Sequence, residues 1–196
     1  MIKHVGRKLY HVLGGLGLLS VWFVLGRPLA FTAYAALLTA VLLFDVARFF
    51  VPRFNAWAMA NLSGFLRPGE ERKLNGTPPY LCGVALTLLL FPEPTAVTAI
   101  LFLVVGDVSA TTVGENWGRH KVGAKSLEGT VAFFVAASLA GFAARALLPG
   151  SAPLAPLTII AGAWCAALVE LFLPRFANDN LVIPLVAAFA MTLLAA

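Results

Sequence analysis

Residues 9–25 read LYHVLGGLGLLSVWFVL, and residues 29–51, which follow the turn Gly26-Arg27-Pro28, read LAFTAYAALLTAVLLFDVARFFV. Each run approaches or exceeds the about 20 largely apolar residues that a helix needs to cross the hydrocarbon of a bilayer. Across the chain, 60% of the residues are hydrophobic and only 12% are charged. A single domain of 196 residues cannot bury this much apolar surface in a water-soluble core, so we expect lipid to be the solvent for most of it.

Further apolar runs follow along the chain, with short polar loops between them. Residues 53–66 differ, because Phe54, Trp57 and Leu62 recur at helical spacing among polar residues; this pattern predicts an amphipathic helix in the membrane interface, with a frayed helix end as the alternative. The sequence therefore predicts one all-α integral membrane domain over 1–196, a helix bundle of about seven spans. We place the spans near residues 9–25, 29–51, 77–91, 95–117, 130–148, 157–173 and 181–196.

The cations are distributed unevenly between the two ends of the predicted spans. If the N-terminus is inside, 12 of the 14 lysines and arginines fall in inner segments, and only Arg27 and Arg145 fall in outer turns. Positive residues gather on the cytoplasmic side of membrane proteins, so we expect a cytoplasmic N-terminus, an outer C-terminus and a location in the cytoplasmic membrane. This rule accounts for the net charge of +5 without nucleic acid, and we expect no nucleic-acid partner. Cys82 and Cys165 lack the spacing of a disulfide framework or metal site.

Nearly every polar group lies on the inner side, where any chemistry is expected. Near the N-terminus, Arg7 and His11 are four residues apart and share a helix face next to Lys8; they are either candidate site residues or, for the two cations, membrane anchors. Asp45 and Arg48 are three apart and are expected to form a structural ion pair. The loop that follows the amphipathic segment contributes further candidates, Arg67, Glu70 and Lys73.

The polar stretch GDVSATTVGENWGRHKVGAKSLEGT covers residues 106–130. Gly106, Ala110, Gly114 and Gly118 are four apart and predict a smooth ridge that allows close approach of another helix. On a neighbouring face, the same spacing aligns two carboxylates and a hydroxyl with the inner surface: Asp107, Thr111 and Glu115.

Carboxylates and cations side by side suit a nucleotide and its metal. Mg²⁺ binds through one or two carboxylates together with substrate phosphates. Cations suit the phosphates themselves, and Arg119, Lys121 and Lys125 are expected on a flexible basic loop over residues 118–129. The stretch is not a P-loop, because Ala124 makes it one residue too long and no strand precedes it.

A last polar group comprises Glu170 and the sequence Asn178-Asp179-Asn180, just before the final span. Asp179 or Asn180 could cap that helix. Alternatively, Asp179 is a second carboxylate that holds a metal or positions a phosphate, and Glu170, Asn178 and Asn180 are further polar candidates.

At these residues the chain resembles the family of dolichol kinases, phytol kinases and CTP-dependent diacylglycerol kinases. The resemblance extends from Arg7 to Pro184, and its specific part is the Gly106-Asp107 stretch together with Lys125-Ser126-Leu127-Glu128-Gly129. One departure is Glu115-Asn116-Trp117, where relatives often carry smaller or basic residues.

The resemblance implies transfer of a phosphoryl group from CTP to the hydroxyl of a membrane lipid alcohol, with Mg²⁺ or another divalent cation. An isoprenoid alcohol (polyprenol, dolichol or phytol) is slightly preferred over diacylglycerol. On this reading the metal is held by Asp107, with Asp179 or Glu128 assisting, and the base is Asp107, Asp179 or His11. The nucleotide and its phosphates are assigned to Arg7, Lys8, Arg67, Lys73, Arg119, Lys121, Lys125, Ser126 and Gly129.

Two other functions remain open from the sequence. A lipid cytidylyltransferase would need similar metal and triphosphate groups but would release pyrophosphate. A transporter could use Asp45, Asp107 and Glu170 as an ion path, although the outer half of the predicted bundle is apolar. The kinase hypothesis requires Asp107, Lys125 and Asp179 to converge in one pocket beneath the cytosolic headgroups.

Overall fold

The computed structural model describes residues 5–62, 65–66, 69–148, 154–174 and 177–195. The chain is predominantly α-helical, which confirms the predicted all-α class. Three of the described helical segments are long and apolar enough to cross a membrane, and three apolar helices are shorter. The elements are α1 (Val5–Phe50), α2 (Pro52–Asn61), α3 (Thr77–Leu90), α4 (Glu93–Leu101), a π-helical turn η1 (Phe102–Gly106), α5 (Asp107–Asn116), β1 (Lys121–Val122), β2 (Lys125–Ser126), α6 (Leu127–Leu147), α7 (Pro156–Phe172) and α8 (Asp179–Ala195).

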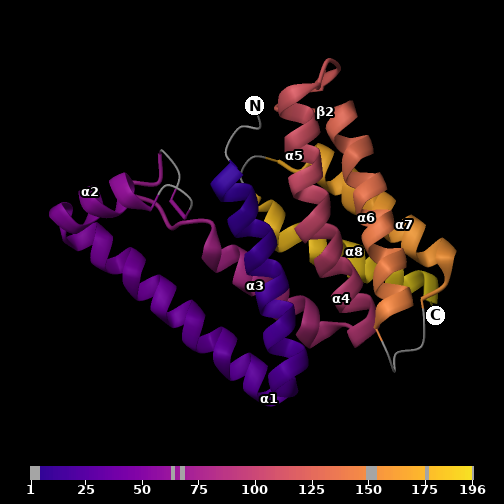
Figure 1. The fold of residues 1–196 in the computed structure, drawn as a ribbon, viewed down its shortest axis with the longest axis horizontal. Coiled ribbons are helices and arrows are strands. Elements are labelled where there is room, and N and C mark those ends of the chain that lie inside the picture. Colours follow the sequence, from indigo (N-terminus) through magenta and orange to yellow (C-terminus); the bar gives the residue numbers. More distant parts are fainter. Residues whose placement is uncertain (1–4, 63–64, 67–68, 149–153, 175–176, 196) are drawn as a thin grey trace. The chain divides into compact units, whose positions relative to one another are not determined.

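Two compact units make up the described chain, one over residues 4–85 and the other over residues 86–196. In the first unit, α1 contains both predicted N-terminal spans and bends sharply between them (Figure 1). The bend is at Gly26, whose φ of 73° is left-handed, a conformation that glycine adopts without steric cost. The predicted turn at Gly26-Arg27-Pro28 is therefore confirmed.

Helix α2 is shorter than the amphipathic helix predicted over 53–66. It begins at Pro52 and ends at Asn61, because Leu62 leaves the helical region with φ −112° and ψ 42°. Phe54 packs edge-on against Phe44 of α1, with ring centroids 5.5 Å apart, so this part of α2 is attached to α1 by aromatic contact.

In the second unit, the predicted span 95–117 is one continuous helical segment over Glu93–Asn116. The sequence did not indicate the π-helical turn η1 in its middle, which ends directly before Asp107. Such turns add one residue to the local helical repeat and are frequent near functional sites. Phe102, Leu103 and Val104 of this turn are fully buried, so η1 lies in the core of the unit.

The predicted boundaries around residue 126 require correction. We expected a flexible basic loop up to Gly129 and a span from Thr130, but residues 121–126 form a hairpin and α6 already begins at Leu127. Likewise, α8 begins at Asp179 rather than Leu181. Both helices start earlier because side chains cap them, Ser126 in one case and Asn178 in the other.

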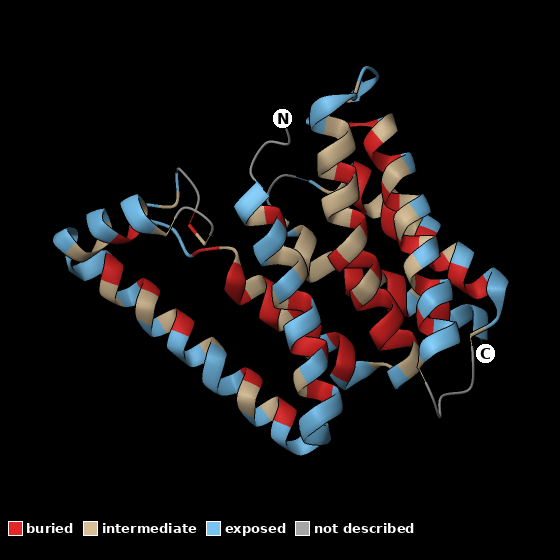
Figure 2. Ribbon diagram, viewed as in Figure 1, coloured by how far each residue is buried: buried red, intermediate tan, exposed pale blue. Residues whose placement is uncertain are grey.

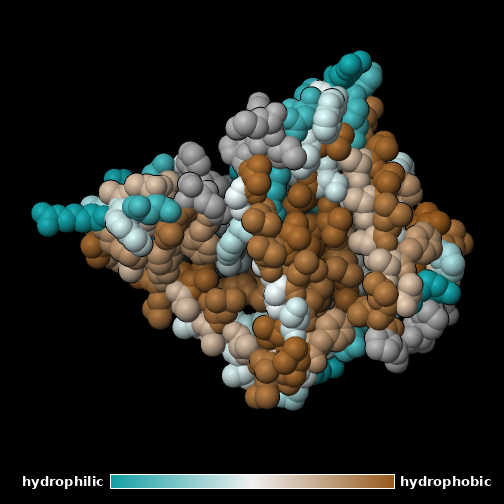
Figure 3. Space-filling view, in the orientation of Figure 1, coloured by the Kyte–Doolittle hydropathy of each residue, from teal (hydrophilic) through white to brown (hydrophobic). Residues whose placement is uncertain are grey.

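Buried and exposed residues alternate around the helices of the second unit (Figure 2). Large apolar side chains remain exposed on its outer faces, for example Leu139 on α6, Leu157 on α7 and Leu193 on α8. The space-filling view shows broad apolar areas over these helices, whereas polar residues gather at the hairpin end (Figure 3). Apolar surface on this scale indicates contact with lipid.

Candidate functional site

The hairpin between α5 and α6 positions the most polar part of the second unit. Strand β1 pairs antiparallel with β2, with Lys121 opposite Ser126 and Val122 opposite Lys125. The chain reverses at Gly123, whose φ of 59° favours glycine. The backbone N–H of Leu127 also donates to the carbonyl of His120 at 3.0 Å, so the predicted flexible loop is an ordered turn.

Ser126 links the hairpin to the start of α6. Its Oγ accepts a hydrogen bond from the backbone N–H of Gly129 at 3.2 Å, and its carbonyl accepts one from the Thr130 hydroxyl at 3.1 Å. A serine in this position is a helix N-cap and satisfies a backbone donor that has no partner within the helix. The remaining N–H groups of the first turn of α6 form a partial positive charge at the hairpin.

Lys125 joins three segments that are distant in sequence. Its Nζ donates to Glu170 Oε1 at 2.6 Å and to Asp179 Oδ2 at 2.9 Å, so the hairpin, α7 and the first turn of α8 meet at one ammonium group. We call Lys125, Glu170 and Asp179 the lysine cluster. The expected approach of Lys125 to Asp179 is thereby confirmed, whereas the pairing of Lys125 with Glu170 was not foreseen.

The charge of Lys125 is determined by these partners. Burial by itself lowers the pKa of the ammonium group, but the charges of Glu170 and Asp179 and their hydrogen bonds outweigh that effect. The pKa of Lys125 is therefore raised above its ordinary value, and the side chain is a cation throughout the neutral range.

Glu170 is buried, with only 3% of its side chain exposed. Its Oε1 bonds to Lys125, but among the described residues its Oε2 has no hydrogen-bond partner. The charges of both Asp107 and Asp179 act on Glu170, so Glu170 lies within electrostatic range of two other carboxylates. A buried acceptor without a partner costs free energy, which marks this oxygen as a candidate ligand atom.

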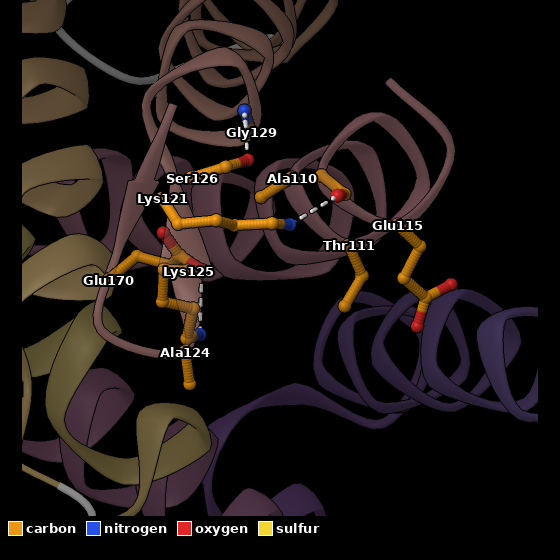
Figure 4. A pocket seen from close by; sticks show the side chains of 10 residues that line it. Ala110, Thr111, Glu115, Lys121, Ala124, Lys125, Ser126, Gly129 and Glu170 are labelled. Atoms are coloured by element: carbon orange, nitrogen blue, oxygen red, sulfur yellow. Dashed lines mark hydrogen bonds and ion pairs between the residues drawn. The ribbon is translucent and has the colours of Figure 1, made fainter. Parts of the chain in front are cut away.

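A cavity of about 260 Å³ lies beside the lysine cluster. Figure 4 shows Lys121 reaching toward α5 and Lys125 turned toward Glu170. Lys121 Nζ donates to the carbonyl of Gly114 at 3.1 Å. The other polar side chains of the wall are Thr111, Glu115 and Ser126.

The small-residue ridge predicted along residues 106–118 packs against the start of α6. A Cβ on Gly106 would lie 2.7 Å from the Phe133 ring, and one on Gly129 would lie 2.9 Å from the carbonyl of Ala110. A Cβ on Gly114 would meet Ser126 Oγ at 3.0 Å. The predicted close approach of another helix is confirmed, and it brings the hairpin next to α5.

Of the three residues predicted to share a helix face, Asp107, Thr111 and Glu115, only two line the cavity. Thr111 and Glu115 line the cavity, whereas Asp107 lies one turn earlier, is half-buried and accepts the Thr111 hydroxyl bond at its backbone carbonyl. Asp107 therefore lies outside the wall of the cavity, although its charge acts on Glu170.

Glu128 has a different partner from the one expected. Its Oε1 contacts His120 Nδ1 at 2.7 Å and accepts the backbone N–H of the same residue at 3.1 Å. Within the described ranges, no three histidine, cysteine or acidic side chains are arranged to hold a metal ion by themselves. Asp107, Asp179 and Glu128 are thus not a preformed three-carboxylate site. Arg119 is exposed beside His120.

Asn178 is the residue that caps α8. The Asn178 carbonyl accepts the N–H of Val182 at 3.0 Å, and its side-chain oxygen accepts the N–H of Asn180 at 3.0 Å. Asn178 therefore caps the helix, where Asp179 or Asn180 had been expected. This cap leaves the Asp179 carboxylate available to Lys125.

The remaining predicted residues belong to the unit over 4–85, which we describe by itself. His11 stacks on Tyr80 with centroids 4.7 Å apart, and the Tyr80 hydroxyl donates to the His11 carbonyl at 3.0 Å. Arg7 and Lys8 lie in the first turn of α1, and Glu70 and Lys73 lie between α2 and α3. Arg67 lies outside the described residues.

The expected ion pair of Asp45 and Arg48 is confirmed. Arg48 Nη2 donates to Asp45 Oδ1 at 2.5 Å, and both side chains are fully buried. Arg48 also donates to the carbonyls of Glu70 and Lys73, at 3.1 and 3.0 Å. The pair thus fixes the shape of the polar segment before α3.

The chain is 33% identical over 162 residues to CTP-dependent diacylglycerol kinase 1 of Schizosaccharomyces pombe, covering 76% of this chain and 74% of that protein. It is also 25% identical over 192 residues to an uncharacterized protein of Rickettsia prowazekii, covering 95% and 92% of the two chains. No family model and no solved structure matches the chain.

The identity of 33% to the Schizosaccharomyces pombe protein extends over about three quarters of both chains. The residues behind the sequence resemblance, from Gly106-Asp107 to Lys125-Ser126-Leu127-Glu128-Gly129, are also those that build the hairpin and the cavity. The chain therefore belongs to the family of CTP-dependent diacylglycerol kinases.

Proposed function

We propose that this protein is a CTP-dependent lipid kinase that transfers the terminal phosphoryl group of CTP to the hydroxyl of a membrane lipid. The observation that carries the proposal is the lysine cluster, in which Lys125 meets two carboxylates beside a cavity at the polar end of apolar helices. The relative named as a CTP-dependent diacylglycerol kinase supports both the nucleotide and the lipid.

The cavity offers the groups that a triphosphate requires. Lys121 and Lys125 supply cations at its wall, and the first turn of α6 supplies backbone N–H groups beyond the Ser126 cap. Helix N-termini bind phosphate because these groups and the helix dipole both favour negative charge. Phosphoryl transfer depends mainly on such positioning and electrostatic stabilisation.

The residues present also fit a divalent cation. Mg²⁺ commonly uses one or two carboxylates and completes its coordination with phosphate oxygens and water, and Glu170 Oε2 is a buried oxygen with no hydrogen-bond partner among the described residues. We assign the metal to Asp179, which was expected, and to Glu170, in place of the expected Asp107 and Glu128. Asp107 does not line the cavity, and Glu128 binds His120. When bound, the cation would neutralise charge that develops on the phosphate oxygens.

We assign Asp107 as the general base that accepts the proton of the lipid hydroxyl. It follows the π-helical turn and is half-buried, and a carboxylate within reach of a hydroxyl can act as a general base. Asp179 and His11 were alternatives, but Asp179 is assigned to the metal and the His11 ring is stacked on Tyr80. For the acceptor we propose diacylglycerol, because the relative's name supports it over the isoprenoid alcohols preferred from the sequence.

The test is transfer of label from γ-³²P-CTP to defined lipid alcohols by purified protein, with products resolved by mass. We expect Asp107→Asn to lower kcat by about 10²–10⁴-fold, the usual contribution of a general base, while the protein still inserts into the membrane. Glu93→Gln is a matched control, because it removes a carboxylate at the start of the same helical segment. Unchanged transfer in Asp107→Asn would exclude the assigned role, and a CDP-lipid with pyrophosphate would overturn the kinase proposal.

A further inference from the structure

We propose that Lys125 occupies the metal-binding carboxylates in the absence of nucleotide, and thereby makes metal binding depend on the nucleotide. Without nucleotide, Lys125 occupies the carboxylates of Glu170 and Asp179. When a triphosphate enters the cavity, Lys125 turns to its phosphates and leaves both carboxylates to a divalent cation. This inference rests on the proposed function, because it concerns the same cavity and the same nucleotide.

The contacts show why lysine and metal exclude each other. The ammonium group donates to Glu170 Oε1 at 2.6 Å and to Asp179 Oδ2 at 2.9 Å, so it already occupies both carboxylates as their shared cation. A divalent cation bound to the same two carboxylates would face the ammonium charge at close range in a poorly screened site, where like charges repel strongly.

The second carboxylate oxygen of Glu170 indicates that the site suits a cation other than lysine. Oε2 is buried and has no hydrogen-bond partner among the described residues, although lysine carries three donors. The pairing with Lys125 therefore satisfies only one of the two Glu170 oxygens. A metal ion bound by the carboxylate would use the acceptor that the lysine leaves unsatisfied.

The side chain of Lys125 is able to move while the backbone stays in place. The hairpin is held by its strand pairing and by the bond from Leu127 to His120, but the Lys125 side chain is 31% exposed and borders the cavity. Its four-carbon stem allows the ammonium group to change partners by rotation alone. Lys121 at the same wall adds attraction for an incoming triphosphate.

Departure of Lys125 alone would be unfavourable. Glu170 would then face the charges of Asp107 and Asp179 with no cation beside it, and a buried charge that loses its partner is strongly destabilising. Arrival of the divalent cation removes that penalty. Nucleotide and metal should consequently raise each other's affinity by the same factor, as thermodynamic linkage requires.

The experiment measures free Mn²⁺ by electron paramagnetic resonance, with the full chain in phosphatidylcholine nanodiscs, with and without β,γ-methylene CTP. Samples of the analogue with empty nanodiscs give the Mn²⁺ that the triphosphate binds by itself, and this amount is subtracted. In the natural protein we expect the analogue to raise Mn²⁺ affinity on the order of tenfold, a typical coupling between two sites. In Lys125→Met, Mn²⁺ should bind more tightly than in the natural protein without the analogue. The analogue should then raise the affinity by a smaller factor than in the natural protein, because only its phosphate oxygens still contribute. Lys125→Arg keeps the cation and should keep the weak binding of nucleotide-free protein.

Two further measurements make the outcome decisive. The double variant Lys125→Met with Glu170→Gln should lose the nucleotide-independent Mn²⁺ site, and thermal unfolding of each variant in the same nanodiscs verifies that the protein is folded. If Lys125→Met binds Mn²⁺ no more tightly than the natural protein without nucleotide, Lys125 forms only a structural ion pair and the inference is overturned. Label transfer from CTP is scored separately, so an active enzyme without this coupling would overturn the inference alone, whereas an inactive one would overturn the proposed function.

Discussion

Arg48 shows how a single buried side chain determines the path of a polar segment. Its guanidinium donates to Asp45, to Asn55 and to the carbonyls of Glu70 and Lys73. Asp45 in turn accepts two bonds from Asn75, both at 3.0 Å. Because the charge is paired and its donors are satisfied, burial of this arginine is tolerated. Of these contacts, only the one between Asp45 and Arg48 was predictable, since the two residues are three apart on one helix.

We expect Arg48→Met to lower the free energy of unfolding by about 3–5 kcal/mol, because it leaves the carboxylate of Asp45 buried without its cation. Adding Asp45→Asn should restore part of this loss, since the two residues form one network and their effects do not add. Denaturant or thermal unfolding in detergent measures both changes. The control is Arg53→Met, which removes an exposed arginine a few residues along the chain; an equal loss in the control would contradict the network.

The packing of the helical segment 93–116 against α6 depends on glycine at defined places. Gly106 lies at the end of the π-helical turn and faces the Phe133 ring. Phe102, in the same turn, fills the space beside Gly141 of α6 and Gly162 of α7. The four-residue spacing of small residues predicted the close contact. The π-helical turn has no comparable signal in the sequence, because its apolar residues suit an α-helix equally well.

We expect Gly106→Ala to destabilise the protein by about 1–3 kcal/mol, the usual cost of overpacking a filled core. The added methyl group would lie 2.7 Å from the Phe133 ring, which is fully buried and has no room to move. Gly17→Ala makes the same chemical change on α1, where no atom lies within 4 Å of the new Cβ, and should be neutral or stabilising. The midpoint of thermal unfolding in detergent compares the two, and equal midpoints would argue against the close contact.

For the whole molecule, the apolar surface and the positions of the cations bear on insertion into the membrane. The described helices leave large apolar side chains exposed along their outer faces, as expected when lipid replaces a water-excluding core. Helices α7 and α8 have 17 residues each and α3 has 14, at or below the length of about 17–25 residues for a spanning helix. The seven-span arrangement and its orientation therefore remain predictions.

We expect the N-terminus to be cytoplasmic and the C-terminus external. Twelve of the 14 lysines and arginines then lie on the inner side, as the positive-inside rule requires. Alkaline phosphatase fused to the C-terminus or after Glu93 should be active, and green fluorescent protein should fluoresce when fused after Gly76. Fluorescence of green fluorescent protein at the C-terminus would contradict an odd number of spans. Alkaline phosphatase activity after Gly76 would contradict a cytoplasmic location of the segment between α2 and α3.

Local properties of the chain were sufficient to predict the membrane environment, the helical class, the bend at Gly26 and the small-residue ridge. Apolar run length, charge distribution and residue size act over a few neighbouring residues, so they can be read in order along the chain. Lys125 meets Glu170 and Asp179 across 45 and 54 residues, and Arg48 meets backbone carbonyls 22 and 25 residues away. Those contacts depend on how α7, α8 and the hairpin pack in one case, and on the path of the segment before α3 in the other. Such packing reflects the summed shape of many side chains, which no short stretch of sequence contains.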